Sequence, residues 1–107
     1  MNYRDHVKSK LKQYKRSDII ITRHAKLRAE FRGIDIDEVI ENIINPDRLI
    51  FAAKQKSSNP DEEKYDCYFG YSKTQAHRYI LVFSGNKIIV PTVIKINRRW
   101  QRMVDKG

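Results

Sequence analysis

Two apolar segments in the second half of the chain are separated by only two residues. Residues 77–84 and 87–96 flank Gly85 and Asn86, and such a pair between runs of β-branched and aromatic residues is typical of a tight β-hairpin. Pro91 lies inside the second segment. Because proline cannot donate a hydrogen bond to a strand ladder, it predicts an edge strand or a β-bulge there. An antiparallel sheet is therefore the centre of the predicted fold.

Two earlier segments extend this sheet. Residues 48–53 form a first apolar run, and residues 64–71 alternate between two faces with the two-residue period of a strand. One face carries Tyr65, Cys67, Phe69 and Tyr71, and the other carries Asp66, Tyr68 and Gly70. Cys67 is the only cysteine, so an internal disulfide is excluded, and its position predicts a buried, unreactive thiol.

Helical periodicity dominates the first half of the chain. The expected helices cover residues 2–15, 23–32 and 35–45, and the apolar run 18–22 is either a strand or the entry to the second helix. Thr22 is placed to cap the second helix and Gly33 to end it. Asp35 and Glu38 have capping-box spacing before the third helix. The acidic residues of this helix are interpreted as caps and a solvated surface.

These elements predict an α+β domain. N-terminal helices would pack on one face of a small antiparallel sheet of about four strands, and the other face would be free to bind a ligand. The whole chain, residues 1–107, is expected to form one domain, in which residues 1–17 are an extra basic helix.

Positive charge is concentrated at the two ends of the chain. The formal net charge is +9, to which residues 1–32 contribute +7, residues 33–66 contribute −5 and residues 67–107 contribute +7. We expect the two basic ends to meet around one positive surface, and a basic small domain indicates a nucleic-acid partner. The sequence has neither an apolar run of about 18–20 residues nor a signal-peptide pattern, so a cytoplasmic protein without a membrane partner is expected.

Three basic residues stand four positions apart in the second helix: His24, Arg28 and Arg32. This spacing places them along one helix face, where the arginines could hold a phosphate through paired hydrogen bonds. The positive end of the helix dipole favours a neutral His24, which suits a general base. Leu27 and Phe31 compete for the core-facing side of the same helix, and the alternative is a histidine at the core edge beside solvated arginines.

A second group of candidates belongs to the sheet and the segment after it. The hairpin region contains Lys64, Tyr68, Tyr71, Lys73, His77 and Arg78, and the final segment contains Lys95, Arg98, Arg99, Trp100 and Arg102. Cations that follow phosphates and rings that stack on bases suit single-stranded nucleic acid. His77 and Arg78 are therefore further catalytic candidates, and Tyr68, Tyr71, Lys73, Lys95, Arg98 and Arg99 are candidate nucleic-acid contacts. The alternative is that strands simply favour aromatic residues.

Other chemistries lack their residues. The four glycines do not have the spacing of phosphate-binding loops. The histidines and the cysteine do not have the spacing of zinc ligands. The sequence therefore predicts no metal and no cofactor.

Several short motifs resemble those of a family of small uncharacterised prokaryotic proteins. The shared features span roughly residues 20–96: Thr22, His24 and Ala25 as a Thr-x-His-Ala opening, then Arg32, Gly33 and Ile34, Val39, Pro46 and the pair Thr92-Val93. This family is similar in layout to the RelE/ParE-type toxins of toxin–antitoxin systems, including the BrnT-like branch.

The resemblance to these toxins implies two hypotheses. The first is metal-independent cleavage of mRNA, free or bound to the ribosome. The second is a non-catalytic nucleic-acid-binding module or a ParE-like inhibitor of DNA gyrase. The resemblance also implies a cognate acidic antitoxin. Metal-free cleavage needs a base, an acid and cations, for which the chain offers His24 or His77 together with Arg28, Arg32, Arg78 or Lys95.

Overall fold

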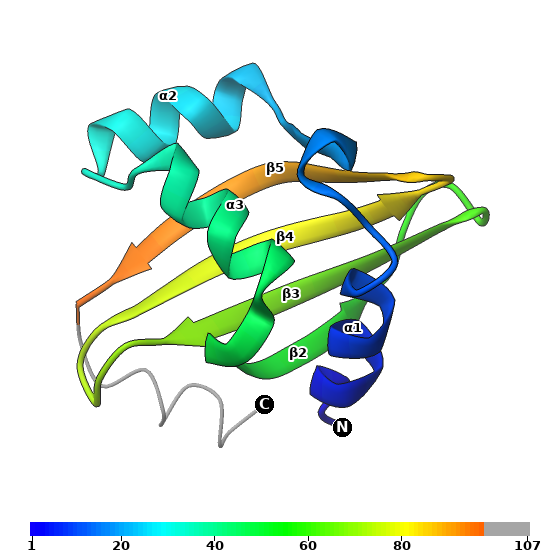
Figure 1. The fold of residues 1–107 in the computed structure, drawn as a ribbon, viewed down its shortest axis with the longest axis horizontal. Coiled ribbons are helices and arrows are strands. Elements are labelled where there is room, and N and C mark those ends of the chain that lie inside the picture. The colour runs from blue at the N-terminus through cyan, green and yellow to red at the C-terminus, as the bar shows by residue number, and fades with distance from the viewer. Residues whose placement is uncertain (98–107) are drawn as a thin grey trace.

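The structure of the protein, a computed structural model, describes residues 1–97. Its helices are α1 (Arg4–Leu11), α2 (Arg23–Phe31) and α3 (Ile36–Ile44), with 3₁₀ turns at Arg16–Asp18 and Pro46–Arg48. Its strands are β1 (Ile19–Ile21), β2 (Leu49–Gln55), β3 (Glu62–Gly70), β4 (Ala76–Ser84) and β5 (Lys87–Ile96). The helices gather on one face of the sheet (Figure 1), so the domain is α+β as predicted. Within the described residues no helix is long and apolar enough to cross a bilayer.

The sheet has five strands in the order β1-β5-β4-β3-β2. Strands β2 to β5 form the predicted antiparallel meander. The prediction of a purely antiparallel sheet of about four strands is wrong at β1, which pairs in parallel with β5 from Ile19↔Ile88 to Ile21↔Val90. A strand of three residues carries too little periodicity to be distinguished from a helix entry, and its partner lies in the last strand of the described chain.

Pro91 lies at a β-bulge. The β4–β5 register passes from Ile80↔Thr92 to Val82↔Ile89, so β5 has an additional residue at this point. Before Pro91 β5 lies between β1 and β4, but from Pro91 on it is the outermost strand of the sheet, so the edge alternative also holds there. β1 pairs with β5 only before Pro91, so the outer edge of β5 needs other hydrogen-bond partners after that residue.

Local signals at both ends of α2 work as predicted. Thr22 Oγ1 accepts a hydrogen bond from the Ala25 amide (3.1 Å). Gly33 has a φ of 67°, a left-handed conformation that glycine adopts at low cost, and the Ile34 amide donates to the Ala29 carbonyl (2.8 Å). This pairing is the Schellman arrangement that closes a helix.

The face of α2 that packs on the sheet is not the expected one. Ala25 and Ala29 are fully buried, whereas Leu27 is 56% exposed and Phe31 is 95% exposed. The expectation that Leu27 and Phe31 compete for the core is therefore wrong. Small side chains let the backbone of α2 approach β5 closely, and the larger residues remain on the outer surface.

α3 crosses the sheet with Val39 and Ile43 buried beneath it. On the opposite sheet face, however, Asp66, Tyr68 and Ile80 are also buried. The expectation of a free second face is therefore wrong at these positions.

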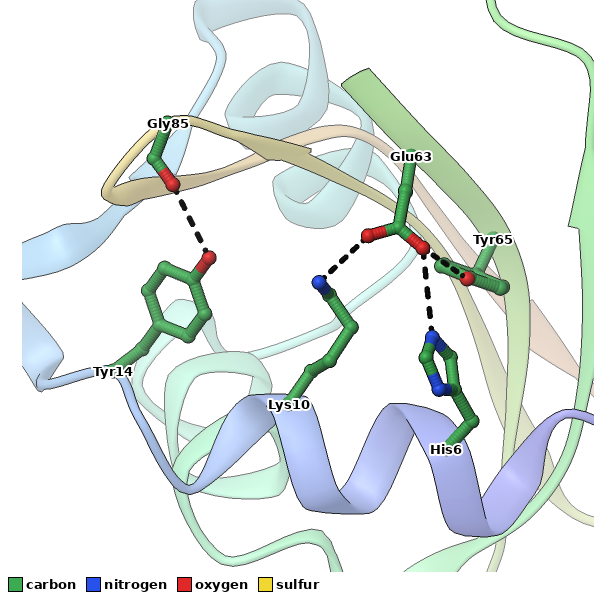
Figure 2. Close-up of polar contacts among 6 residues, drawn as sticks. All are labelled: His6, Lys10, Tyr14, Glu63, Tyr65 and Gly85. Atoms are coloured by element: carbon green, nitrogen blue, oxygen red, sulfur yellow. Dashed lines mark hydrogen bonds and ion pairs between the residues drawn. The ribbon is translucent and has the colours of Figure 1, made fainter. Parts of the chain in front are cut away.

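α1 docks at the other end of the sheet from the β3–β4 loop (Figure 1). It is shorter than the predicted helix 2–15, and its Val7 and Leu11 are buried. Its polar side is held by Glu63 at the start of β3, which accepts from Lys10 Nζ (2.6 Å) as Figure 2 shows. Tyr14, beyond the helix, donates to the Gly85 carbonyl (3.3 Å).

Candidate functional site

A pocket of about 170 Å³ lies at the end of the sheet where β3 passes into β4. It is lined by Gly33, Glu38, Tyr71, Gln75, Ala76, His77, Lys95 and Ile96. These residues come from the beginning of α3 and the turn before it, from the β3–β4 loop, and from the neighbouring ends of β4 and β5. The pocket therefore unites segments that are far apart in the sequence.

Strand alternation and helix periodicity aim the polar side chains at this place. His77 and Tyr79 are two residues apart on β4 and therefore share a face. Lys95 on β5 stands opposite His77 in the register. Glu38 and Asn42 are four residues apart on α3 and so lie on one side of the helix. Their separate elements thus converge on one point above the sheet.

A chain of hydrogen bonds joins α3 to β4 at the pocket. The Tyr71 hydroxyl donates to Glu38 Oε2 (2.7 Å). Asn42 Nδ2 donates to the hydroxyl oxygens of Tyr71 (2.8 Å) and Tyr79 (3.0 Å). The Tyr79 hydroxyl lies 2.6 Å from His77 Nδ1. Within the described residues every buried side-chain nitrogen and oxygen has a partner, so this polar network is satisfied and can fix the side chains in place.

The charge state of His77 follows from its surroundings. Burial lowers the pKa of His77, because the charged imidazolium would lose its hydration. The negative charge of Glu38 opposes this shift, while the positive charges of Lys95 and Arg48 add to it. Since the ordinary value is 6.5, the ring is neutral near pH 7. Burial also raises the pKa of the Tyr79 hydroxyl, which therefore keeps its proton.

One cation, Lys95, lines the pocket, and a second, Arg48, lies beside it against Tyr71. Arg48 stacks on Tyr71, with its guanidinium carbon 4.2 Å from the ring centroid, and donates to the Gly70 carbonyl (3.4 Å). Arg48 and Lys95 are both exposed. Among the ion pairs within residues 1–97 none involves either of them. The cations can therefore attract an anion to the pocket. The carboxylate and the imidazole there can take part in proton transfer or hydrogen bonding beside it.

Three of the predicted site residues come together here. His77, Tyr71 and Lys95 all line the pocket, although the sequence assigned them to separate catalytic and binding groups. Tyr71 lies with Arg48 over one side of its ring and with the His77 ring at 4.8 Å. It therefore acts as a support between these two groups.

The spaced trio of α2 is not brought to the pocket. His24 and Arg28 are exposed on α2 and do not line it. Arg32 lies beyond the end of the helix and donates to the Val93 carbonyl (2.6 Å). It thereby gives one carbonyl of β5 a hydrogen-bond donor beyond the end of β1.

Tyr68 and Arg78 lie on the opposite sheet face from His77. Arg78 Nε donates to Asp66 Oδ1 (2.7 Å), and its guanidinium lies 5.4 Å from the Tyr68 ring. Lys64 shares this face, since β3 alternates. The sheet therefore divides the predicted group of basic and aromatic residues between its two sides.

The remaining predicted residues either do not line the pocket or lie outside residues 1–97, which the structure describes. Lys73 is exposed in the β3–β4 loop and does not line the pocket. Arg98 and Arg99 lie outside the described residues, as do Trp100 and Arg102. The expected meeting of the two basic ends therefore stays a prediction.

Four residues of the site are not among the residues predicted from the sequence: Glu38, Asn42, Arg48 and Tyr79. Glu38 was interpreted as half of a capping box, but Asp35 alone caps α3, by accepting from the Asp37 amide (2.9 Å), while Glu38 accepts from Tyr71. One signal was available. A polar Asn42 within the apolar stripe of α3 indicates a buried polar partner.

Comparison of the chain with protein-family models, curated proteins and solved structures finds no match. Among residues 1–97, no group of three or more His, Cys, Asp or Glu side chains could hold a metal ion. The geometry of the pocket is therefore the basis for a functional proposal.

Proposed function

We propose that the protein cleaves RNA without a metal ion, by attack of a ribose 2′-hydroxyl on the adjacent phosphate in this pocket. One observation carries the proposal: a neutral imidazole, an ammonium group and a carboxylate line the same pocket, from His77, Lys95 and Glu38. Such a set meets the needs of proton transfer and of charge stabilisation.

Positive charge at the pocket would stabilise the phosphate during the reaction. Attack by the 2′-oxygen increases the negative charge on the non-bridging phosphate oxygens, and nearby positive groups stabilise that charge. Lys95 lines the pocket, Arg48 lies beside it against Tyr71, and both side chains are exposed. The net charge of +9 favours approach of a polyanion from solution. The expected products are a 2′,3′-cyclic phosphate and a 5′-hydroxyl.

The test uses a single-stranded RNA oligonucleotide in the presence of EDTA, with and without ribosomes. We expect cleavage in EDTA and the two product ends named above. A matched oligonucleotide with one 2′-deoxyribose at the cleaved position should remain intact there, because it lacks the nucleophile. RNA binding without cleavage under all these conditions would instead support the non-catalytic nucleic-acid-binding module. Inhibition of DNA gyrase without RNA cleavage would support the ParE-like alternative.

We propose in addition an acidic protein partner that covers the outer surface of α2, as the toxin hypothesis implies. The exposed Leu27 and Phe31 form an apolar pair on a helix that also carries Arg23, Lys26 and Arg28 at the surface. This combination complements an acidic amphipathic segment. A small acidic protein encoded by a neighbouring gene should co-purify with the chain. Phe31→Ser should weaken that complex. If the unmodified chain and Phe31→Ser bind the partner equally well, the partner does not bind at this surface.

A further inference from the structure

The hydrogen-bond chain at the pocket has a direction, which the Glu38 carboxylate sets. An ionised carboxylate only accepts hydrogen bonds, so the 2.7 Å contact from Tyr71 to Glu38 uses the single phenol proton of Tyr71. The Tyr71 oxygen must then accept at its second contact, 2.8 Å from the Asn42 amide group. Only the amide nitrogen can donate there. This requirement fixes which way the Asn42 side chain is turned.

Asn42 passes the direction on to Tyr79. The same amide nitrogen lies 3.0 Å from the Tyr79 oxygen, which therefore accepts. Tyr79 is fully buried, and its own proton needs an acceptor. His77 Nδ1 lies 2.6 Å away. If Nδ1 instead carried a proton and donated it, the phenol proton would remain buried without a partner, which is unfavourable.

The neutral His77 ring therefore carries its proton on Nε2. Within residues 1–97 this nitrogen has no hydrogen-bond partner, and no buried side-chain nitrogen there lacks one, so Nε2 reaches the solvent of the pocket. The same reasoning applies to Glu38: Oε2 is occupied by Tyr71, and Oε1 faces solvent. The pocket thus presents a fixed N–H donor and a free carboxylate oxygen.

We propose that Glu38 is the general base of the cleavage and that His77 is a fixed hydrogen-bond donor to the phosphate. This inference rests on the proposed RNA cleavage and assigns its roles. Glu38 Oε1 takes the proton of the 2′-hydroxyl, and the 2′-oxygen forms a bond to phosphorus. The bond from phosphorus to the 5′-oxygen breaks. The 5′-oxygen takes a proton from water, and Glu38 returns its proton to solvent.

In this scheme His77 keeps its proton throughout. Nε2–H donates to a non-bridging phosphate oxygen, whose negative charge grows as the 2′-oxygen attacks. Asn42 and Tyr79 are positioning residues, since they act through the orientation of the His77 ring. Protonation of Nδ1 would break the bond that Tyr79 donates, so the network itself keeps the imidazole neutral.

The position of the proton can be measured without any enzymatic activity. Two-dimensional ¹H–¹⁵N spectra of the intact labelled protein distinguish the ring nitrogen that carries the proton. At pH 8 we expect His77 protonated on Nε2. Asn42→Asp reverses the direction of the chain, because a carboxylate accepts from Tyr79, and should move the proton to Nδ1. An Nδ1-protonated ring in the unmodified protein, or an unchanged proton position in folded Asn42→Asp, would overturn the inference.

The role of Glu38 is tested by Glu38→Gln, whose amide oxygen can still accept from Tyr71 but cannot serve as a base. We expect the turnover number to fall about 10²–10⁴-fold and the acidic limb of the pH–rate profile to disappear. Glu41→Gln is the matched control, because Glu41 is exposed on the same helix and pairs with Arg16 (3.2 Å). It should cleave like the unmodified chain.

The outcomes separate this inference from the proposed function. If the unmodified protein fails to cleave any RNA, the proposed function fails, and Glu38 has no base role to perform. If the protein cleaves RNA and Glu38→Gln retains both its rate and its pH profile, RNA cleavage stands and the assignment of the base is overturned.

Discussion

Glu63 and Glu38 each lie beside a histidine and a tyrosine, but at opposite ends of the sheet. Glu63 accepts hydrogen bonds from Lys10 (2.6 Å) and Tyr65 (2.7 Å) and lies 3.5 Å from His6 (Figure 2). The hydrogen bond from Lys10 is the largest cause that lowers the pKa of Glu63 to about 2. Both carboxylate oxygens of Glu63 thus have partners within the fold.

At the pocket end, by comparison, several polar groups lack internal hydrogen-bond or ion-pair partners among the described residues. Glu38 has one hydrogen-bond donor among the described residues, and neither Lys95 nor Arg48 forms an ion pair with them. His77 uses Nδ1 in the fold and leaves Nε2 toward solvent. Similar residue types therefore serve two purposes. Where all partners are internal they hold a helix in place, and where partners are missing they can bind a ligand.

The largest expected effect is the difference in cleavage rate between variants of His77 and His6. His77→Gln removes the ring donor at the pocket, and the cleavage rate should fall about 10²–10³-fold, which is the usual effect of losing one such donor. His6→Gln should leave the rate unchanged, because His6 is half exposed at the other end of the sheet. Oligonucleotide cleavage by both variants provides the measurement. Equal losses in the two variants would break the distinction between the ends.

The second prediction concerns the structural role of α1. Leu11 is the last residue of α1 and is fully buried. Leu11→Ala should therefore lower the free energy of unfolding by about 3 kcal/mol. Urea unfolding followed by circular dichroism measures this change. Cleavage per folded molecule should stay the same, since the pocket lies at the opposite end. A loss of specific activity in the fully folded variant would show that the two ends are coupled.

The smallest expected effect is the contribution of Glu63 to the free energy of unfolding, which is lost at acidic pH. The folded pKa of Glu63 is about 2, below its ordinary value of 4.5, so between these values the unfolded chain binds more protons. The stabilisation is complete above pH 4.5 and is lost as the pH falls toward 2. Because solvent screens this partly exposed group, the contribution is about 1 kcal/mol.

Glu63→Gln tests this difference directly. Its free energy of unfolding should depend less on pH in the acidic range than that of the unmodified protein. Thermal melts at a series of pH values compare the two proteins. Parallel curves would mean that Glu63 contributes no proton-linked stability and that the α1 end is held by apolar packing alone.

Local features of the fold were accessible to prediction. Gly33 closes α2, and Gly85 begins the two-residue turn of the hairpin with a φ of 58°. Pro91 falls at a bulge. Each of these depends on the backbone preferences of one or two residues, which the sequence states directly. The parallel pairing of β1 was not accessible, because it joins segments at opposite ends of the chain.

The candidate site was predictable only in part. His77, Tyr71 and Lys95 were selected by residue type, but so were His24 and Arg28, which do not line the pocket. No rule of spacing separates the two groups. Their difference lies in which face of each element meets the core.

The sequence by itself determined the helical and strand periods, the turns between them and the excess of positive charge. These follow from backbone conformations and side-chain properties that act over a few residues. The tertiary structure alone decided that α2 packs through alanines, and that Asn42 meets Tyr71 and Tyr79. A buried polar group must find a partner, and which partner it finds depends on how distant segments pack together.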